Sequence, residues 1–110
     1  MSEYRSITVE TGREFVGKYR KLDRRIERQG ALRKAYIRAG DAEKAADAAD
    51  RHSEALDEQE DLVFEEMRRL WVNARQTDET LPELPESWDT EASGRAIRFS
   101  FYEIEAFRRI

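Results

Sequence analysis

A chain of 110 residues with 40% charged side chains and a net charge of −4 can build only one thin hydrophobic core. It contains no cysteine, which excludes disulfides and thiolate metal sites. No apolar run approaches the roughly 18 residues of a membrane-spanning helix, and residues 1–5 are polar, unlike a secretion signal. We therefore expect a cytoplasmic protein that does not enter membranes and forms a single domain over 1–110.

The first ten residues favour extended backbone. Ile7 and Val9 alternate with polar residues, which predicts a short strand or extended segment over 1–10. Thr11 and Glu14 then have the spacing of a capping box, in which the two side chains satisfy backbone N–H groups of the first helical turn. We expect a helix to begin at Thr11.

After this cap, apolar residues recur at helical intervals and predict a helix over 11–39. The apolar face changes direction after Gly30, because Leu32 and Tyr36 lie about 100° away from the earlier stripe. An interior glycine also costs about 1 kcal/mol relative to alanine. The sequence therefore predicts a kink or a short break near residue 30.

Gly40 and Asp41 mark the boundary between two helices. Glycine suits the left-handed backbone that ends a helix, and aspartate suits the N-cap of the next one. The second helix is predicted over 41–76, because one apolar stripe continues from Ala42 to Ala74 without proline or glycine. At 1.5 Å per residue it would be roughly 50 Å long.

Residues 77–94 are predicted to form a loop. They are mostly polar, and Pro82 and Pro85 favour extended backbone that lacks internal hydrogen bonds. We expect Trp88 to anchor this loop.

The last segment, 95–110, fits either a strand or a helix. Ile97, Phe99 and Phe101 alternate with polar residues, which favours a strand over 96–104. If the helices run out and back, the two terminal segments meet near the open end and can pair as a small β-ribbon. Because an isolated two-stranded ribbon is marginally stable, this arrangement favours extra strands from a second copy.

A chain reversal at Gly40 would make facing residue numbers sum to about 82. Ile26 would then face Leu56, and Ile37 would face Ala45. The resulting fold class is mainly α, a long antiparallel helical hairpin resembling a coiled coil, with short terminal segments.

The charges of the two helices support this pairing. Residues 13–38 hold ten basic and three acidic residues, a net charge of +7, whereas residues 41–66 hold eleven acidic and two basic residues, a net charge of −9. Exposed ion pairs contribute only about 0.2–1 kcal/mol each, so their main effect is to favour this arrangement over others.

The sequence offers little for catalysis. His52 is the only histidine, and no glycine-rich phosphate loop is present. Glu58 and Asp61 have the Glu-x-x-Asp spacing found in some Mg²⁺-dependent helical enzymes, but a companion acidic run is missing. We therefore expect no enzyme activity, with no catalytic, cofactor-binding or metal-binding residues.

The leading interpretation is a helical protein–protein interaction module that self-associates, with a dimer favoured, and acts as an adaptor or regulator of a protein partner. Large aromatic residues dominate the energetics of protein interfaces. The candidate partner-binding residues are Trp71, Trp88, Phe99, Phe101, Tyr102 and Phe107.

Two alternatives remain open. A row of carboxylates could imitate a phosphate backbone, as in small acidic phage-type inhibitors of restriction or CRISPR nucleases that act by DNA mimicry or site occlusion. The candidate acidic surface is Glu54, Asp57, Glu58, Asp61 and Glu65. The third interpretation is nucleic-acid binding through the basic helix, which is disfavoured because the facing helix is strongly acidic.

Overall fold

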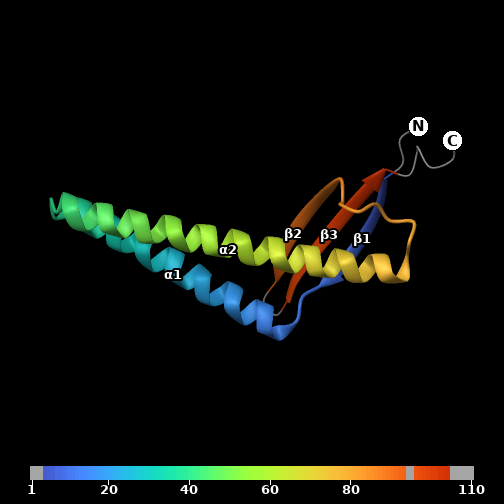
Figure 1. Cartoon of the computed structure of the whole chain (residues 1–110). Helices are drawn as coiled ribbons and strands as arrows, with labels where there is room; N and C mark the ends of the chain where they lie inside the picture. Colours follow the sequence, from blue (N-terminus) through green and yellow to red (C-terminus); the bar gives the residue numbers. More distant parts are fainter. Residues whose placement is uncertain (1–3, 94–95, 105–110) are drawn as a thin grey trace. The chain divides into compact units, whose positions relative to one another are not determined.

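The computed structural model describes residues 4–93 and 96–104. Its elements are, in chain order, β1 (Tyr4–Glu10), α1 (Arg13–Arg38), α2 (Ala42–Thr77), β2 (Ser87–Ser93) and β3 (Ala96–Ile104) (Figure 1). The predicted fold class, a mainly helical chain with two packed helices and a small sheet that contains both terminal segments, is confirmed.

The chain divides into two compact units. Residues 17–64 form the hairpin unit, and the described residues of 1–16 and 65–110 form the sheet unit. Both helices contribute residues to both units. A single domain over 1–110 stays a prediction.

The turn between the helices follows the predicted chemistry. Gly40 has a φ of 74°, and the backbone N–H groups of Gly40 and Asp41 donate to the carbonyls of Ile37 and Tyr36 at 3.1 and 2.9 Å. These two bonds are the Schellman pattern that ends a helix. The Asp41 carboxylate then accepts a hydrogen bond from the backbone N–H of Lys44 at 3.1 Å, which makes it the N-cap of α2.

The contacts between the helices follow the predicted register. Arg25 forms an ion pair with Glu58 at 3.0 Å, and the Gln59 amide donates to Asp23 at 3.1 Å. Gly30 lies against the His52 ring, whose Cδ2 would be 3.7 Å from a Cβ at that position. The residue numbers in each pair sum to 82 or 83, in agreement with the predicted value.

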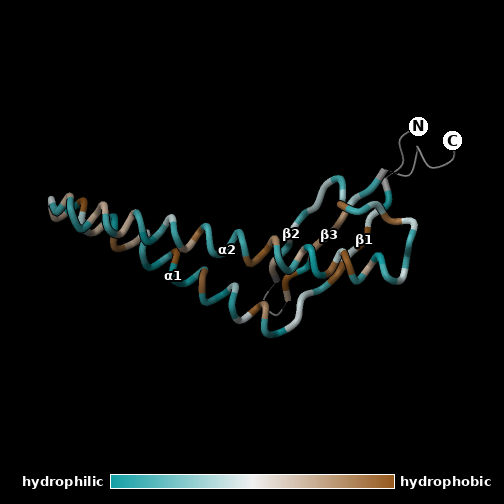
Figure 2. The backbone as a smooth tube through the Cα atoms, in the orientation of Figure 1, coloured by the Kyte–Doolittle hydropathy of each residue, from teal (hydrophilic) through white to brown (hydrophobic). Residues whose placement is uncertain are grey.

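The core of the hairpin unit is made mainly of alanine. Ala45, Ala48 and Ala55 are buried, whereas the exposed fractions of Ile37 and Leu56 are 56% and 43%. These two large residues, predicted to face the other helix, are therefore not part of the hairpin core. The residues of α2 that pack against α1 recur at alternating three- and four-residue intervals, as in a coiled coil, and they lie along one edge of the apolar stripe. The rest of the stripe is therefore not covered by α1. Figure 2 shows how sparse apolar residues are in both helices here.

Helix α1 is continuous through Gly30, so the predicted short break is wrong. The helix is supported there by α2, and a single glycine does not overcome this tertiary packing. The kink stays a prediction. The N-cap is Gly12 and not the predicted Thr11, because the Val16 N–H donates to Gly12 O at 3.2 Å, while the Thr11 hydroxyl donates to Ile97 O at 3.0 Å.

The sheet has the order β1-β3-β2, and both pairings are antiparallel. A strand forms at 4–10, within the strand or extended segment predicted over 1–10, and the strand favoured over 96–104 is confirmed; the two pair with each other within one chain. Residues 87–93 form a third strand, so the loop predicted over 77–94 is wrong in its second half. Because this chain supplies its own third strand, the sheet needs no strand from a second copy.

One face of the sheet forms the main aromatic core. Ile97, Phe99 and Phe101 of β3 are buried. Phe15 packs edge-on against Phe99 with ring centres 6.0 Å apart, and Trp71 packs against Phe101 at 5.2 Å. The first turn of α1 and the last part of α2 thus cover the apolar side of this sheet.

Candidate interaction surfaces

Three of the six aromatic residues predicted to bind a partner are core residues. Trp71, Phe99 and Phe101 are almost completely buried within the sheet unit. The Trp71 indole also donates to Pro82 O at 2.9 Å, so Trp71 holds the loop after α2. These side chains already fill the interior that their size favours, so assigning them to a surface for partners was wrong.

Of the other three aromatic candidates, Trp88 and Tyr102 are half-buried and make contacts within the sheet unit. Trp88, predicted to anchor a loop, is half-buried in β2 and packs edge-on against Phe99 at 6.3 Å. The half-buried Tyr102 donates to Asp89 at 3.2 Å, and this hydrogen bond raises the pKa of the tyrosine. Phe107 lies outside the described residues.

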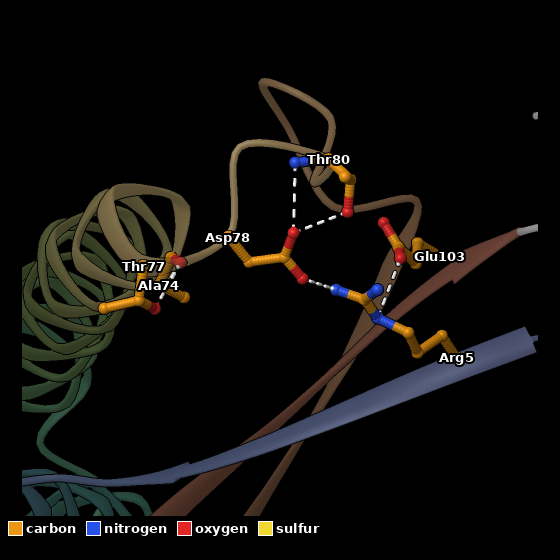
Figure 3. Close-up of polar contacts among 6 residues, drawn as sticks. All are labelled: Arg5, Ala74, Thr77, Asp78, Thr80 and Glu103. Carbon is orange, nitrogen blue, oxygen red and sulfur yellow. Dashed lines mark hydrogen bonds and ion pairs between the residues drawn. The ribbon is translucent and has the colours of Figure 1, made fainter.

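An ion cluster that the sequence did not indicate lies at one end of the sheet (Figure 3). Arg5 of β1 pairs with Glu103 of β3 at 3.0 Å and with Asp78 in the loop after α2. The Asp78 carboxylate also accepts a hydrogen bond from the Thr80 backbone N–H at 3.0 Å. Glu103 is only 2% exposed, so the Arg5 guanidinium forms an ion pair with a buried carboxylate. Through its two ion pairs, Arg5 connects β1, β3 and the loop after α2.

Hydrogen bonds lower the pKa of the Asp78 carboxyl in this cluster. The Thr80 hydroxyl, the Arg5 guanidinium and the Thr80 N–H all donate to Asp78 and lower the pKa of its carboxyl below the ordinary value of 3.8. Register explains the Arg5–Glu103 contact, because these residues are partners in the β1–β3 ladder. The arrangement holds the sheet and loop together.

The hairpin unit presents a different surface on each side. One side carries an open groove of about 650 Å³ whose lining includes Ile26, Gly30, Ile37 and His52. Leu56 lies one helical turn beyond His52 and extends the same side. We call these five residues the isoleucine face. It includes two large apolar side chains that are more than 40% exposed, Ile37 and Leu56.

The opposite side of the hairpin is covered by charged side chains. One small depression of about 410 Å³ lies between Leu22, Leu62 and the Arg25–Glu58 ion pair. A second depression is lined by Lys44 and Tyr36, and the Lys44 ammonium lies 5.9 Å from the centre of the Tyr36 ring. Long polar side chains therefore shield the apolar residues on this side.

The predicted acidic surface is exposed. Its members are Glu54, Asp57, Glu58, Asp61 and Glu65. Since Ala48 and Ala55 of α2 are buried towards α1, most of these carboxylates lie on the outer side of α2, away from the basic helix. Glu58 is the member that reaches a cation of α1, through its ion pair with Arg25.

Metal and membrane sites have no structural support in the part of the chain that the structure describes. Among residues 4–93 and 96–104, no group of three or more histidine, aspartate or glutamate side chains could hold a metal ion. The single histidine, His52, is half-buried against Gly30. No helix in these residues is long and apolar enough to cross a membrane.

Comparison with known proteins gives no relative: no protein-family model matches the chain, and no curated protein or solved structure is significantly similar to it.

Proposed function

We propose that this chain is a non-enzymatic protein–protein interaction module that acts as an adaptor or regulator and also self-associates. The isoleucine face is its main binding surface. One observation carries the proposal: the hairpin buries alanines in its own core and leaves Ile37 and Leu56 exposed on one side.

Energetic considerations support this assignment. Burying apolar surface stabilises a complex by roughly 25 cal/mol per Å², and an exposed apolar patch with a polar rim is typical of an interaction site. Glu27, Arg33 and Lys34 line the same groove and provide such a rim. Charged rim residues add specificity more than affinity, which suits a regulator.

A second candidate function is inhibition of a nucleic-acid enzyme through the acidic surface. Its support is the position of Glu54, Asp57 and Asp61 on the outer side of α2, where the cations of α1 do not cover them. Such binding would weaken steeply as salt rises, because screening reduces contacts between exposed charges. Binding through the isoleucine face would depend much less on salt.

The first test is affinity capture of the tagged protein from its native lysate, with and without nuclease treatment, read by mass spectrometry. The proposal predicts a stoichiometric protein partner that resists nuclease and stays bound in about 0.5 M salt, where charges are screened beyond roughly 4–5 Å. A partner released by this salt, especially a nuclease, would favour the acidic surface. Recovery of nucleic acid itself would contradict both functions and favour the basic side of α1.

A pair of variants separates the two surfaces. Leu56→Ser removes apolar area from the isoleucine face, and Asp61→Asn removes one charge from the acidic surface. Both positions are exposed, so both variants should fold normally. The proposal predicts that only Leu56→Ser weakens capture of the partner.

A further inference from the structure

The isoleucine face is a side of the hairpin unit that its own fold leaves largely uncovered. Within this unit the two helices bury small residues against each other, while Ile37 and Leu56 remain exposed beside an open groove. A helix pair with an apolar side normally packs that side against further helices, as in four-helix bundles. The partner that fits must therefore present two helices, or one long helix, to this face.

The charges of the hairpin unit restrict the choice of partner. Residues 17–38 hold nine basic and two acidic residues, a net charge of +7, and residues 42–64 hold eight acidic and two basic residues, a net charge of −6. All of these charged side chains are exposed. A helix packed beside α1 should therefore be acidic, and a helix packed beside α2 should be basic. A second copy of this hairpin supplies one helix of each kind, connected by the same short turn.

Symmetry then selects one arrangement of the two copies. A twofold axis perpendicular to the helices would place α1 beside α1 and α2 beside α2, so that like charges become neighbours. A twofold axis parallel to the helices places α1 of each copy beside α2 of the other. Charges then alternate around the four helices, and every neighbouring pair is antiparallel.

We infer that a second copy of this chain docks on the isoleucine face through a twofold axis parallel to the helices, with both hairpin turns at the same end. The inference rests on the proposed function, because it assigns self-association to the same face. This axis leaves the helices of both copies at the same height. Facing residue numbers between the copies therefore also sum to about 82, so Ile26 of one copy lies near Leu56 of the other. The two Ile37 side chains approach the axis from opposite sides.

Sedimentation equilibrium of the full chain from about 1 to 100 µM, the range of weak to moderate self-association, tests the surface. The wild type should be a dimer. Leu56→Glu should weaken dimerisation at least about tenfold, because it buries a charge in an apolar interface. Ala35→Glu adds the same charge at an exposed position on the outer side of α1 and should change dimerisation little. Circular dichroism verifies that each variant is helical, and Ile37→Ser provides a second, milder variant.

The symmetry is tested by one distance. The chain has no cysteine, so Ala39→Cys allows a single spin label beside the turn. With both turns at the same end, the two labels of a dimer should lie roughly 20–30 Å apart, given interaxial distances of 8–10 Å and the length of the label. A perpendicular axis through the middle of the hairpin would separate the turns by roughly 30 Å more along the helices.

Three results would overturn the inference: a monomer at every concentration, a dimer unaffected by Leu56→Glu, or the long distance between labels. Its failure is distinguishable from failure of the proposed function. A monomeric wild type that still captures a protein through Leu56 contradicts self-association but supports the adaptor function. A dimer with the short distance that captures no other protein supports the inference and contradicts the adaptor function.

Discussion

Gly30 of α1 lies against His52 of α2, and a Cβ at Gly30 would meet the imidazole Cδ2 and Nε2 atoms at 3.7 and 3.8 Å. These are ordinary van der Waals distances, so the site can accept a methyl group. The contact has the same register as the Asp23–Gln59 and Arg25–Glu58 contacts between the two helices. Glycine is therefore tolerated here and is not required.

Gly30→Ala should stabilise the protein by about 0.5–1 kcal/mol, because alanine restricts the unfolded chain and favours helix without creating a clash. Urea denaturation measures this change. Gly40→Ala is the matched control and should destabilise by about 1 kcal/mol, because Gly40 has a φ of 74°. Destabilisation by Gly30→Ala would show that the register at His52 is wrong.

Local signals explain which parts of the hairpin could be predicted. Gly40 and Asp41 act within one or two turns of chain, and their caps formed as expected. The register followed from charge and from the position of this turn. The exposure of Leu56 could not be derived in this way, because the packing of Ala48 and Ala55 decides which edge of the stripe meets α1.

The parts that could not be predicted depend on partners distant in sequence. Strand β2 contains only one large apolar residue, Trp88, and it is a strand because its backbone pairs with β3. The Arg5 cluster joins residues 73 and 98 positions apart, and nothing local identifies them. The identities of Trp71 and Phe99 suit a core as well as an interface, so only burial distinguishes the two roles.

The Arg25–Glu58 ion pair gives a second prediction. Both side chains are about half exposed, so Glu58→Arg should cost only about 0.2–1 kcal/mol, as is usual for surface pairs. The exchange of both residues, Arg25→Glu with Glu58→Arg, should restore most of the loss. Thermal denaturation of the two single variants and the double variant forms a double-mutant cycle. A coupling energy of zero would contradict a stabilising contact between them.

Arg5→Ala should be more costly than loss of the surface pair. It leaves Glu103, which is 2% exposed, without the guanidinium that lies 3.0 Å away. Breaking such a contact typically costs about 3 kcal/mol, and the partial exposure of Arg5 should reduce this to roughly 2 kcal/mol. Urea denaturation tests the value. Arg5→Ala combined with Glu103→Gln should recover part of the stability, whereas an unchanged midpoint for Arg5→Ala alone would mean that the cluster does not hold the sheet.

Asp78 predicts a pH dependence of defined sign. Its folded pKa lies below the ordinary 3.8, so the carboxylate stabilises the fold above about pH 4, and this contribution is lost as pH falls through the folded value. Asp78→Asn should therefore lower the melting temperature at pH 6 but have little effect near pH 2. Melting curves between these values test the sign. An effect of Asp78→Asn that is larger at pH 2 than at pH 6 would contradict it.

The central claim is that the isoleucine face binds other proteins or a second copy of the chain. The most direct measurement is quantitative affinity capture by the wild type, by the double variant Ile37→Ser with Leu56→Ser, and by the control Ala35→Ser, with self-association measured on the same samples. We predict that the double variant keeps its helical content and loses most of the captured partner and of the dimer, while the control keeps both. Equal capture and equal self-association by all three proteins would contradict the claim and place the binding surface elsewhere on the chain.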